Sequence, residues 1–232
     1  MTTVEKAVVV TRPTRLQESV KRYNTKAQAK FYVEKRGQSF QDYELEEDIY
    51  EHSRDHVLKA IPRDLKIQIV DRNFLPNYLF SPKDLIICLG QDGLVVNTAK
   101  YLEGQPVIAI NPDPDRFDGV LLPFLPDQTE AAVQAVMNGK FQARNLTMAR
   151  VDMNDGQKLY AFNDLFIGPR SHITARYTIH DGERSERQMS SGILVATPAG
   201  STGWISSLFN QTRGIARFQG GGSPLAGMRL EW

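Results

Sequence analysis

The chain has 232 residues, 28 of them basic and 27 acidic, with a formal net charge of +1. This length can bury a sizeable core and form two modest domains, and the balanced charge leaves no global field for nucleic acid. No apolar run is as long as a membrane span, and residues 1–6 are not a signal peptide. The single cysteine, Cys88, cannot form an internal disulfide, which suits a reducing cytoplasm. From these features together we expect a cytoplasmic protein without a membrane or nucleic-acid partner.

The chain begins with an apolar run at residues 7–10, which predicts a first strand. Apolar residues then recur at helical spacing from Leu16 to Phe31 and predict a helix. This helix carries a basic face on its other sides, which is either solvated or attracts phosphate groups. The basic residues are Arg15, Arg22, Lys26 and Lys30.

A second helix is predicted over Glu46–Ile61, ended by Pro62, and a strand follows at 66–70. His52 and His56 lie one turn apart in this helix, a spacing that allows joint metal binding. However, the helix lacks the His-Glu-x-x-His pattern and no third ligand is evident. We therefore interpret both as surface histidines and predict no metal site made by the protein alone.

The run Leu85–Leu89 predicts a strand that is buried on both faces and stops at Gly90. Apolar spacing over 94–102 predicts a helix packed on the sheet, so Asp92 lies in a strand-to-helix turn. Such a turn offers unpaired N–H groups and the positive end of a helix dipole, which favour phosphate oxygens. Asp92 is either a helix-capping residue or a functional carboxylate that accepts a proton or binds a metal. The turn matches neither the P-loop nor the Rossmann fingerprint.

A strand at 107–111 completes an alternation of strands and helices, which predicts a parallel, Rossmann-like α/β domain over residues 1–125. Two prolines in residues 111–115 then break regular structure. Aspartates at 113, 115 and 118 are reminiscent of a calcium loop, but the prolines and the missing downstream glutamate argue against one.

Residues 126–232 are predicted to form a β-rich, β-sandwich-like domain. It begins with a helix at 127–138 that closes at Gly139. Short apolar runs separated by turn signals then predict strands, at 146–151, 158–162, 165–167 and 173–179. The sequence stops at 230–232 within what looks like another strand, so we expect this β domain to be truncated.

One more strand, at 193–196, runs directly into the turn Thr197–Trp204, which is dense in hydroxyl and glycine residues. Hydroxyl groups and bare backbone suit the polar edges of a ligand. Trp204 either supplies a flat face for a base or anchors the core.

Three of these segments, in this order, resemble the signature of the NAD kinase family. Residues 90–93, Gly-Gln-Asp-Gly, are similar to the family's Gly-Gly-Asp-Gly turn, and Asn163-Asp164 is similar to its Asn-Glu pair. Residues 197–204, Thr-Pro-Ala-Gly-Ser-Thr-Gly-Trp, are similar to its Thr-Pro-Thr-Gly-Ser-Thr-Ala-Tyr loop. Three ordered motifs are far more specific than any one of them.

The resemblance implies a two-domain kinase that moves the terminal phosphoryl group of ATP, or in some members polyphosphate, to the 2′-hydroxyl of the adenosine ribose of NAD. It implies that Asp92 is the base that accepts the proton of that hydroxyl, in a cleft between the domains. The turn residues Gly90, Gln91 and Gly93 would lie against the phosphates, and Mg²⁺ would enter with those phosphates. The other implied nucleotide contacts are Asn163, Asp164, Thr197, Ser201, Thr202 and Trp204.

The family commonly forms dimers or tetramers, so the resemblance also implies a homo-oligomer whose other partners are small nucleotides. Several departures from the family pattern indicate a divergent branch. Gln91 places a side chain where the family has glycine, Asp164 is one methylene shorter than glutamate, and Ala199 lacks a hydroxyl group. Two alternatives follow: a related kinase with another acceptor, such as a lipid, and a dinucleotide-binding module without turnover.

Overall fold

The computed structural model describes residues 4–220, and the chain divides into two compact units, Met1–Ala143 and Arg144–Trp232. The strand expected at residues 230–232 lies outside the described residues. The sequence-predicted boundary at 125/126 precedes the division between the units. The helix between these two positions, α5 (Thr129–Met137), packs on the core of unit 1.

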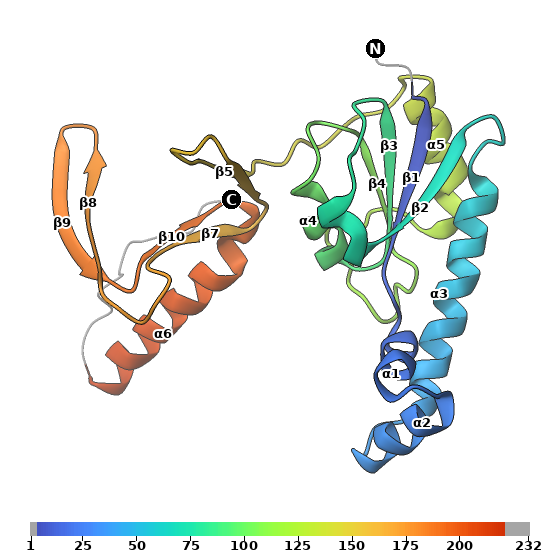
Figure 1. Ribbon diagram of the computed structural model, residues 1–232, viewed down its shortest axis with the longest axis horizontal. Coiled ribbons are helices and arrows are strands. Elements are labelled where there is room, and N and C mark those ends of the chain that lie inside the picture. The colour runs from blue at the N-terminus through green and yellow to red at the C-terminus, as the bar shows by residue number, and fades with distance from the viewer. Residues whose placement is uncertain (1–3, 221–232) are drawn as a thin grey trace. The chain divides into compact units, whose positions relative to one another are not determined.

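Unit 1 contains a four-stranded sheet in which all pairs are parallel, as predicted (Figure 1). Its order is β2-β1-β3-β4, with β1 at Lys6–Thr11, β2 at Lys66–Asp71, β3 at Asp84–Leu89 and β4 at Val107–Ile110. Every residue of β3 is buried, which explains its continuous apolar run. The chain leaves β1 towards β2 and leaves β3 towards β4. The carboxyl ends of β1 and β3 therefore form the switch point of the sheet, where open α/β folds bind ligands.

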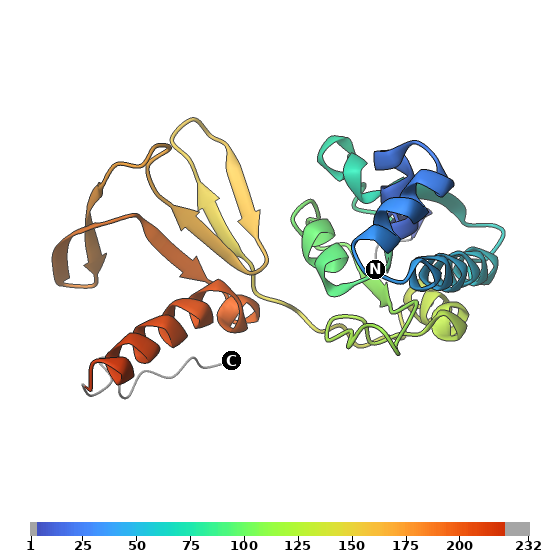
Figure 2. The same cartoon turned by 90° about the horizontal axis from the view of Figure 1, so that it is seen from below.

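Helices cover both faces of this sheet (Figure 2). On one face, α3 (Phe40–Ala60) and α5 bury Val57 and Val133 against β1 and β3. On the other face, α4 (Asp92–Ala99) and the 3₁₀ segment Arg72–Asn77 bury Leu94 and Leu75. A second 3₁₀ segment, Pro126–Gln128, leads into α5.

The single helix predicted over 16–31 is wrong, because the structure has two helices there. These are α1 (Arg15–Tyr23) and α2 (Lys26–Lys35). Asn24 adopts a left-handed conformation with φ of 67°, which ends α1, and the Thr25 side chain caps α2 by accepting a hydrogen bond from the Gln28 N–H. The helix predicted to start at Glu46 also begins earlier, at Phe40, after Ser39.

The described part of unit 2, residues 144–220, is β-rich, as predicted, and contains three antiparallel pairs of strands. The pairs are β5 (Ala149–Asp152) with β6 (Lys158–Ala161), β7 (Asp164–Ile167) with β10 (Ile193–Ala196), and β8 (Ala175–Asp181) with β9 (Arg184–Ser190). Two further elements were not predicted: the strand β9 and a helix, α6 (Trp204–Phe218), which follows the 3₁₀ turn Ala199–Thr202. Within residues 4–220, no helix is both long and apolar enough to cross a bilayer.

Candidate functional site

The Gly90–Gly93 turn connects the buried strand β3 to the start of α4. Gln91 is the N-cap residue with extended backbone, and its side chain makes no capping hydrogen bond. Asp92 is the first helical residue, where its negative charge interacts favourably with the helix dipole. The first N–H groups of an α-helix have no partner within the helix, so this turn can donate to phosphate oxygens.

The Asp92 carboxylate also holds a neighbouring loop. Its Oδ1 atom accepts a hydrogen bond of 2.6 Å from the backbone N–H of Leu121, in the segment that follows β4. Asp92 is half-buried. One carboxylate oxygen is therefore fixed by the loop, which orients the group at the switch point of the sheet.

Arg12, at the carboxyl end of β1, lies beside this turn and was not predicted from the sequence. Its side-chain carbons Cδ and Cγ lie 3.5 and 3.6 Å from the position that a Cβ atom on residue 90 would occupy. The Cδ2 atom of Leu94 lies 3.0 Å from the same position. Gly90 is thus needed for close packing of Arg12 and Leu94 against the turn. The available sequence signal was the position of Arg12 just after the first apolar strand, at the edge where ligands bind.

A buried ionic network holds Arg12 in place. Its Nη2 atom donates to Glu46 Oε1 at 3.0 Å, and Arg15 donates to the other carboxylate oxygen of Glu46. Glu46 is only 3% exposed. Burial opposes its ionisation, but the two arginines outweigh burial and hold the pKa of Glu46 below its ordinary value. The Nε atom of Arg12 is buried and has no hydrogen-bond partner among residues 4–220.

Tyr50 of α3 links this network to the end of β3. Its hydroxyl group accepts from the backbone N–H of Arg12 and donates to the carbonyl oxygen of Leu89, both at 3.1 Å. Burial raises the pKa of Tyr50 to about 12, so the phenol stays protonated. One side chain therefore binds the backbone of both strands that flank the switch point.

The second set of predicted residues forms one hydrogen-bonded turn in unit 2. The backbone N–H of Thr197 donates to the carbonyl oxygen of Asn163 at 2.8 Å. The Thr197 hydroxyl donates to the backbone carbonyl oxygen of Phe162 at 2.6 Å. The hydroxyl also accepts from the N–H of Gly200 at 3.1 Å. Thr197 thus joins the Asn163-Asp164 segment to the turn after β10.

Gly200 has a steric role in this turn. A Cβ atom at position 200 would lie 1.9 Å from the carbonyl oxygen of Asn163, so only glycine fits. Ser201 is buried and donates to the carbonyl oxygen of Pro198 at 2.7 Å. Thr197, Gly200 and Ser201 are therefore used to build the turn.

The remaining predicted residues of unit 2 present free groups to solvent. Asn163 and Thr202 are exposed, and the side chains of Asn163 and Asp164 have no hydrogen-bond partner among residues 4–220. Trp204 is 48% exposed, and its ring centroid lies 5.5 Å from that of Phe166. Trp204 is therefore not a core anchor, and part of its ring is open to a ligand.

The described residues contain no cluster of three or more His, Cys, Asp or Glu side chains that could hold a metal ion. His52 and His56 are both exposed on α3. Asp113 binds Arg116 Nε at 2.9 Å, which keeps this aspartate within its own loop.

Comparison with known proteins gives matches to nucleotide kinases, although no protein-family model matches the sequence. The chain is 32% identical over 129 residues to an NAD kinase of Chlorobium phaeobacteroides, covering 53% of this chain and 44% of the relative. It is 30% identical over 176 residues to an NAD kinase of Ruminiclostridium cellulolyticum, covering 71% and 58%. A probable NADH kinase of Oryza sativa subsp. japonica is 31% identical over 157 residues, covering 57% and 48%. The chain thus spans about half the length of these relatives.

Proposed function

We propose that this chain, which belongs to the NAD kinase family, transfers a phosphoryl group from ATP to the 2′-hydroxyl of the adenosine ribose of NAD and so forms NADP. The observation that carries the proposal is the place of Asp92. A carboxylate stands at the N-terminus of α4, at the switch point of a parallel sheet, and one of its oxygens is fixed by Leu121.

In this proposal, the Gly90–Gly93 turn binds phosphate oxygens through its backbone N–H groups and the dipole of α4. Asp92 accepts the proton of the ribose hydroxyl as that oxygen attacks the terminal phosphorus of ATP, and the bond to ADP breaks. Phosphoryl transfer depends mainly on positioning and charge stabilisation, so a fixed carboxylate is well suited to it. Mg²⁺ would arrive on the donor's phosphates and keep several of its waters.

The unit 2 turn would contribute recognition of the nucleoside. Asn163 and Asp164 have polar side chains without partners within residues 4–220, which leaves them available for ribose or base groups. Thr202 is exposed and lies two residues before Trp204 in the sequence. The open face of the Trp204 ring suits stacking on a base. Thr197 and Ser201 would act indirectly, because their hydroxyl groups already hold the turn.

We also propose a cytoplasmic homo-oligomer. A reducing compartment suits the free and fully buried Cys88. Unit 2 leaves large apolar side chains exposed, including Leu159, Phe166 and Ile167, each at least 50% exposed, and such surfaces often mark interfaces. Light scattering on the purified full-length protein would measure the mass, and a monomer across a range of concentrations would argue against the oligomer.

The kinase proposal is tested by incubating full-length protein with ATP, magnesium and either NAD or NADH. Product is measured by a dehydrogenase specific for NADP or, for the reduced acceptor, NADPH. NADP formation that depends on ATP supports the proposal, and the NADH arm identifies which redox form is accepted. Calorimetric binding of NAD without any product would indicate a module without turnover. Phosphorylation of a detergent-dispersed lipid instead of NAD would indicate a lipid kinase.

A further inference from the structure

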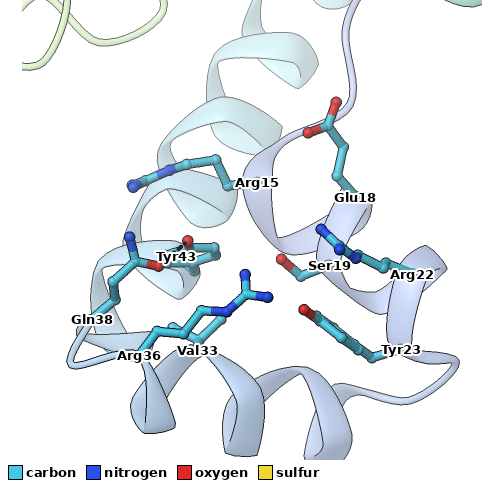
Figure 3. Close-up of a pocket in the computed structure, with 9 residues that line it drawn as sticks. All are labelled: Arg15, Glu18, Ser19, Arg22, Tyr23, Val33, Arg36, Gln38 and Tyr43. Carbon is cyan, nitrogen blue, oxygen red and sulfur yellow. Dashed lines mark hydrogen bonds between the residues drawn. The ribbon is translucent and has the colours of Figure 1, made fainter.

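A hollow of about 280 Å³ lies between α1, α2 and the start of α3 in unit 1 (Figure 3). We call it the arginine hollow, because three arginines line it together with hydroxyl and aromatic side chains. Its key residues are Arg15, Ser19, Arg22, Tyr23, Arg36 and Tyr43. None of them belongs to the site proposed for phosphoryl transfer.

The break between α1 and α2 creates this hollow. The left-handed residue Asn24 turns the chain so that α2 packs beside α1, around Leu16 and Val33. Arg22 from α1 and Arg36 from the end of α2 then line the same space. In an unbroken helix these two residues would lie about 20 Å apart along the axis.

Two of the three arginine charges in the hollow are not balanced by an ion pair within residues 4–220. Arg22 and Arg36 form no ion pair with any residue in 4–220, whereas Lys26 on the same helices pairs with Glu44 at 2.6 Å. Arg15 is bound to the buried Glu46. Glu18 is the one acidic residue of the lining, and in Figure 3 its carboxylate points away from the middle. Two guanidinium groups therefore share one concave surface without a partner anion.

The lining groups converge on the space between them. In Figure 3 the guanidinium groups of Arg22 and Arg36 and the hydroxyl groups of Ser19 and Tyr23 face the middle of the hollow. The guanidinium of Arg15 lies over the Tyr43 ring at 4.5 Å from its centroid, and the Tyr43 hydroxyl donates to Gln38 at 2.9 Å, which fixes this wall. Arginine forks bind phosphate oxygens in pairs, and hydroxyl groups can donate to the remaining oxygens.

We propose that the arginine hollow binds a diphosphate group, either as free pyrophosphate or as part of a nucleotide. A water molecule occupies about 30 Å³, so the hollow has room for roughly nine groups of that size. A diphosphate, whose covalently bonded atoms pack more closely than separate waters, therefore fits within the hollow. The combined charge of Arg22 and Arg36 suits an anion with two or more negative charges.

The test is calorimetric titration of the full-length protein with pyrophosphate. The double variant Arg22→Gln/Arg36→Gln removes both unpaired charges of the hollow. Lys21→Gln/Lys35→Gln is a matched control, because it removes the same charge from the neighbouring positions in the chain, which do not line the hollow. All four positions are exposed, so we expect both double variants to fold like the wild type.

We expect the arginine double variant to weaken pyrophosphate binding at least about tenfold, because each lost charge-assisted contact contributes to affinity. The lysine control should change it about twofold or less. No binding by the wild type, or equal weakening in both double variants, would overturn the proposal, since equal weakening indicates a general charge effect. An equal loss for pyrophosphate and ADP supports recognition of the diphosphate alone, and a larger loss for ADP supports a nucleotide. NADP formation by the arginine double variant at the wild-type rate would keep this result separate from that of the kinase proposal, because neither arginine belongs to the site proposed for phosphoryl transfer.

Discussion

The two candidate turns are held in place by different forces. The Asp92 turn follows β3, whose six residues are all buried, and rests on a core with an ionic network beside it. The Thr197 turn follows β10, which has no fully buried residue, and is held by hydrogen bonds to Phe162 and Asn163. Packing therefore fixes the first turn, and individual backbone contacts fix the second. Probes specific to each unit should therefore separate the effects that substitutions have on the stability of unit 1 and of unit 2.

The chain provides such probes. Cys88 in β3 is fully buried, and burial raises the pKa of its thiol to about 12, so it reacts with thiol reagents only when unit 1 opens. Trp204 is the one tryptophan among the described residues. In a Trp232→Phe background its fluorescence reports on unit 2 alone.

The largest effect is expected for Glu46→Gln, which leaves the buried Arg12 without a counter-charge. Removing one partner of a buried ion pair costs about 3 to 5 kcal/mol, so unit 1 should open more often. Cys88 labelling should accelerate, while Trp204 fluorescence should change little. Glu44→Gln, which alters an exposed ion pair, is the control and should label like the wild type. Unchanged labelling in Glu46→Gln would contradict the role given to this network.

Glu46 also makes the stability of unit 1 depend on pH in the acid range. Because the folded-state pKa of Glu46 lies below its ordinary value of 4.5, its ionised form stabilises the fold at higher pH. This stabilisation is present above about 4.5 and is lost as pH falls through the lower folded-state pKa. Denaturant unfolding followed by circular dichroism should therefore show a steeper loss of stability in the wild type than in Glu46→Gln as the pH falls from about 4.5 to the folded-state pKa.

Gly200→Ala should act on the other unit, with a cost of about 3 kcal/mol. The new Cβ atom would collide with the backbone carbonyl of Asn163, so the two segments must separate. Trp204 fluorescence should report unfolding at lower denaturant concentration, with Cys88 labelling unchanged. Gly214→Ala within α6 is the matched control, because among residues 4–220 no atom beyond its chain neighbours and the backbone of its own helix lies within 4 Å of the new Cβ. This substitution should stabilise the helix by about 0.5 to 1 kcal/mol. Equal behaviour of the two variants would show that the turn adapts freely.

A smaller effect, about 2 kcal/mol, is expected for Tyr50→Phe. This change leaves the buried N–H of Arg12 and the carbonyl of Leu89 without their side-chain partner. It should also alter the response to base. Because the folded-state pKa is raised from 10.0 to about 12, the phenol stabilises unit 1 below pH 10, and this contribution is lost as the pH rises through about 12. The loss between these pH values should be smaller in Tyr50→Phe, as measured by chemical unfolding.

The smallest effect is expected at the break between α1 and α2. Asn24 has a φ of 67°, a conformation that costs other L-residues about 1 to 2 kcal/mol. Asn24→Ala should therefore lower the midpoint of thermal unfolding by a few degrees. Asn24→Gly should match or exceed the wild type, and an equal drop in both variants would mean that the asparagine side chain, rather than the backbone conformation, is important.

Much of the fold could be predicted because local patterns reflect burial. The apolar runs at 7–10 and 85–89 became buried strands, and the runs predicted at 146–151 and 158–162 correspond to the paired strands β5 and β6. The helix break at Asn24 was missed, since apolar spacing continues across it. β9 was missed because its exposed, polar sequence has no apolar alternation, and α6 was missed because it contains Gly214 and several weak helix formers.

The candidate site was only partly predictable for a related reason. The position of Asp92 between a strand and a helix follows from local sequence. The contacts of Thr197 with Phe162 and Asn163, and of Arg12 with Glu46, join residues 34 or 35 positions apart. Such contacts depend on how elements pack, which no local pattern records. The steric need for Gly200 likewise appears only when the Asn163 carbonyl is in place.

The most direct test of the central claim compares Asp92→Asn with the wild type in ATP-dependent NADP formation. Asparagine keeps an oxygen that can accept from the Leu121 N–H, so the fold should be preserved while the proton acceptor is lost. Asp115→Asn, an exposed aspartate of the loop after β4, is the control. The account predicts a rate at least ~10²-fold lower for Asp92→Asn with unchanged unfolding, and a wild-type rate for Asp115→Asn. A folded Asp92→Asn protein that forms NADP at the wild-type rate would contradict it.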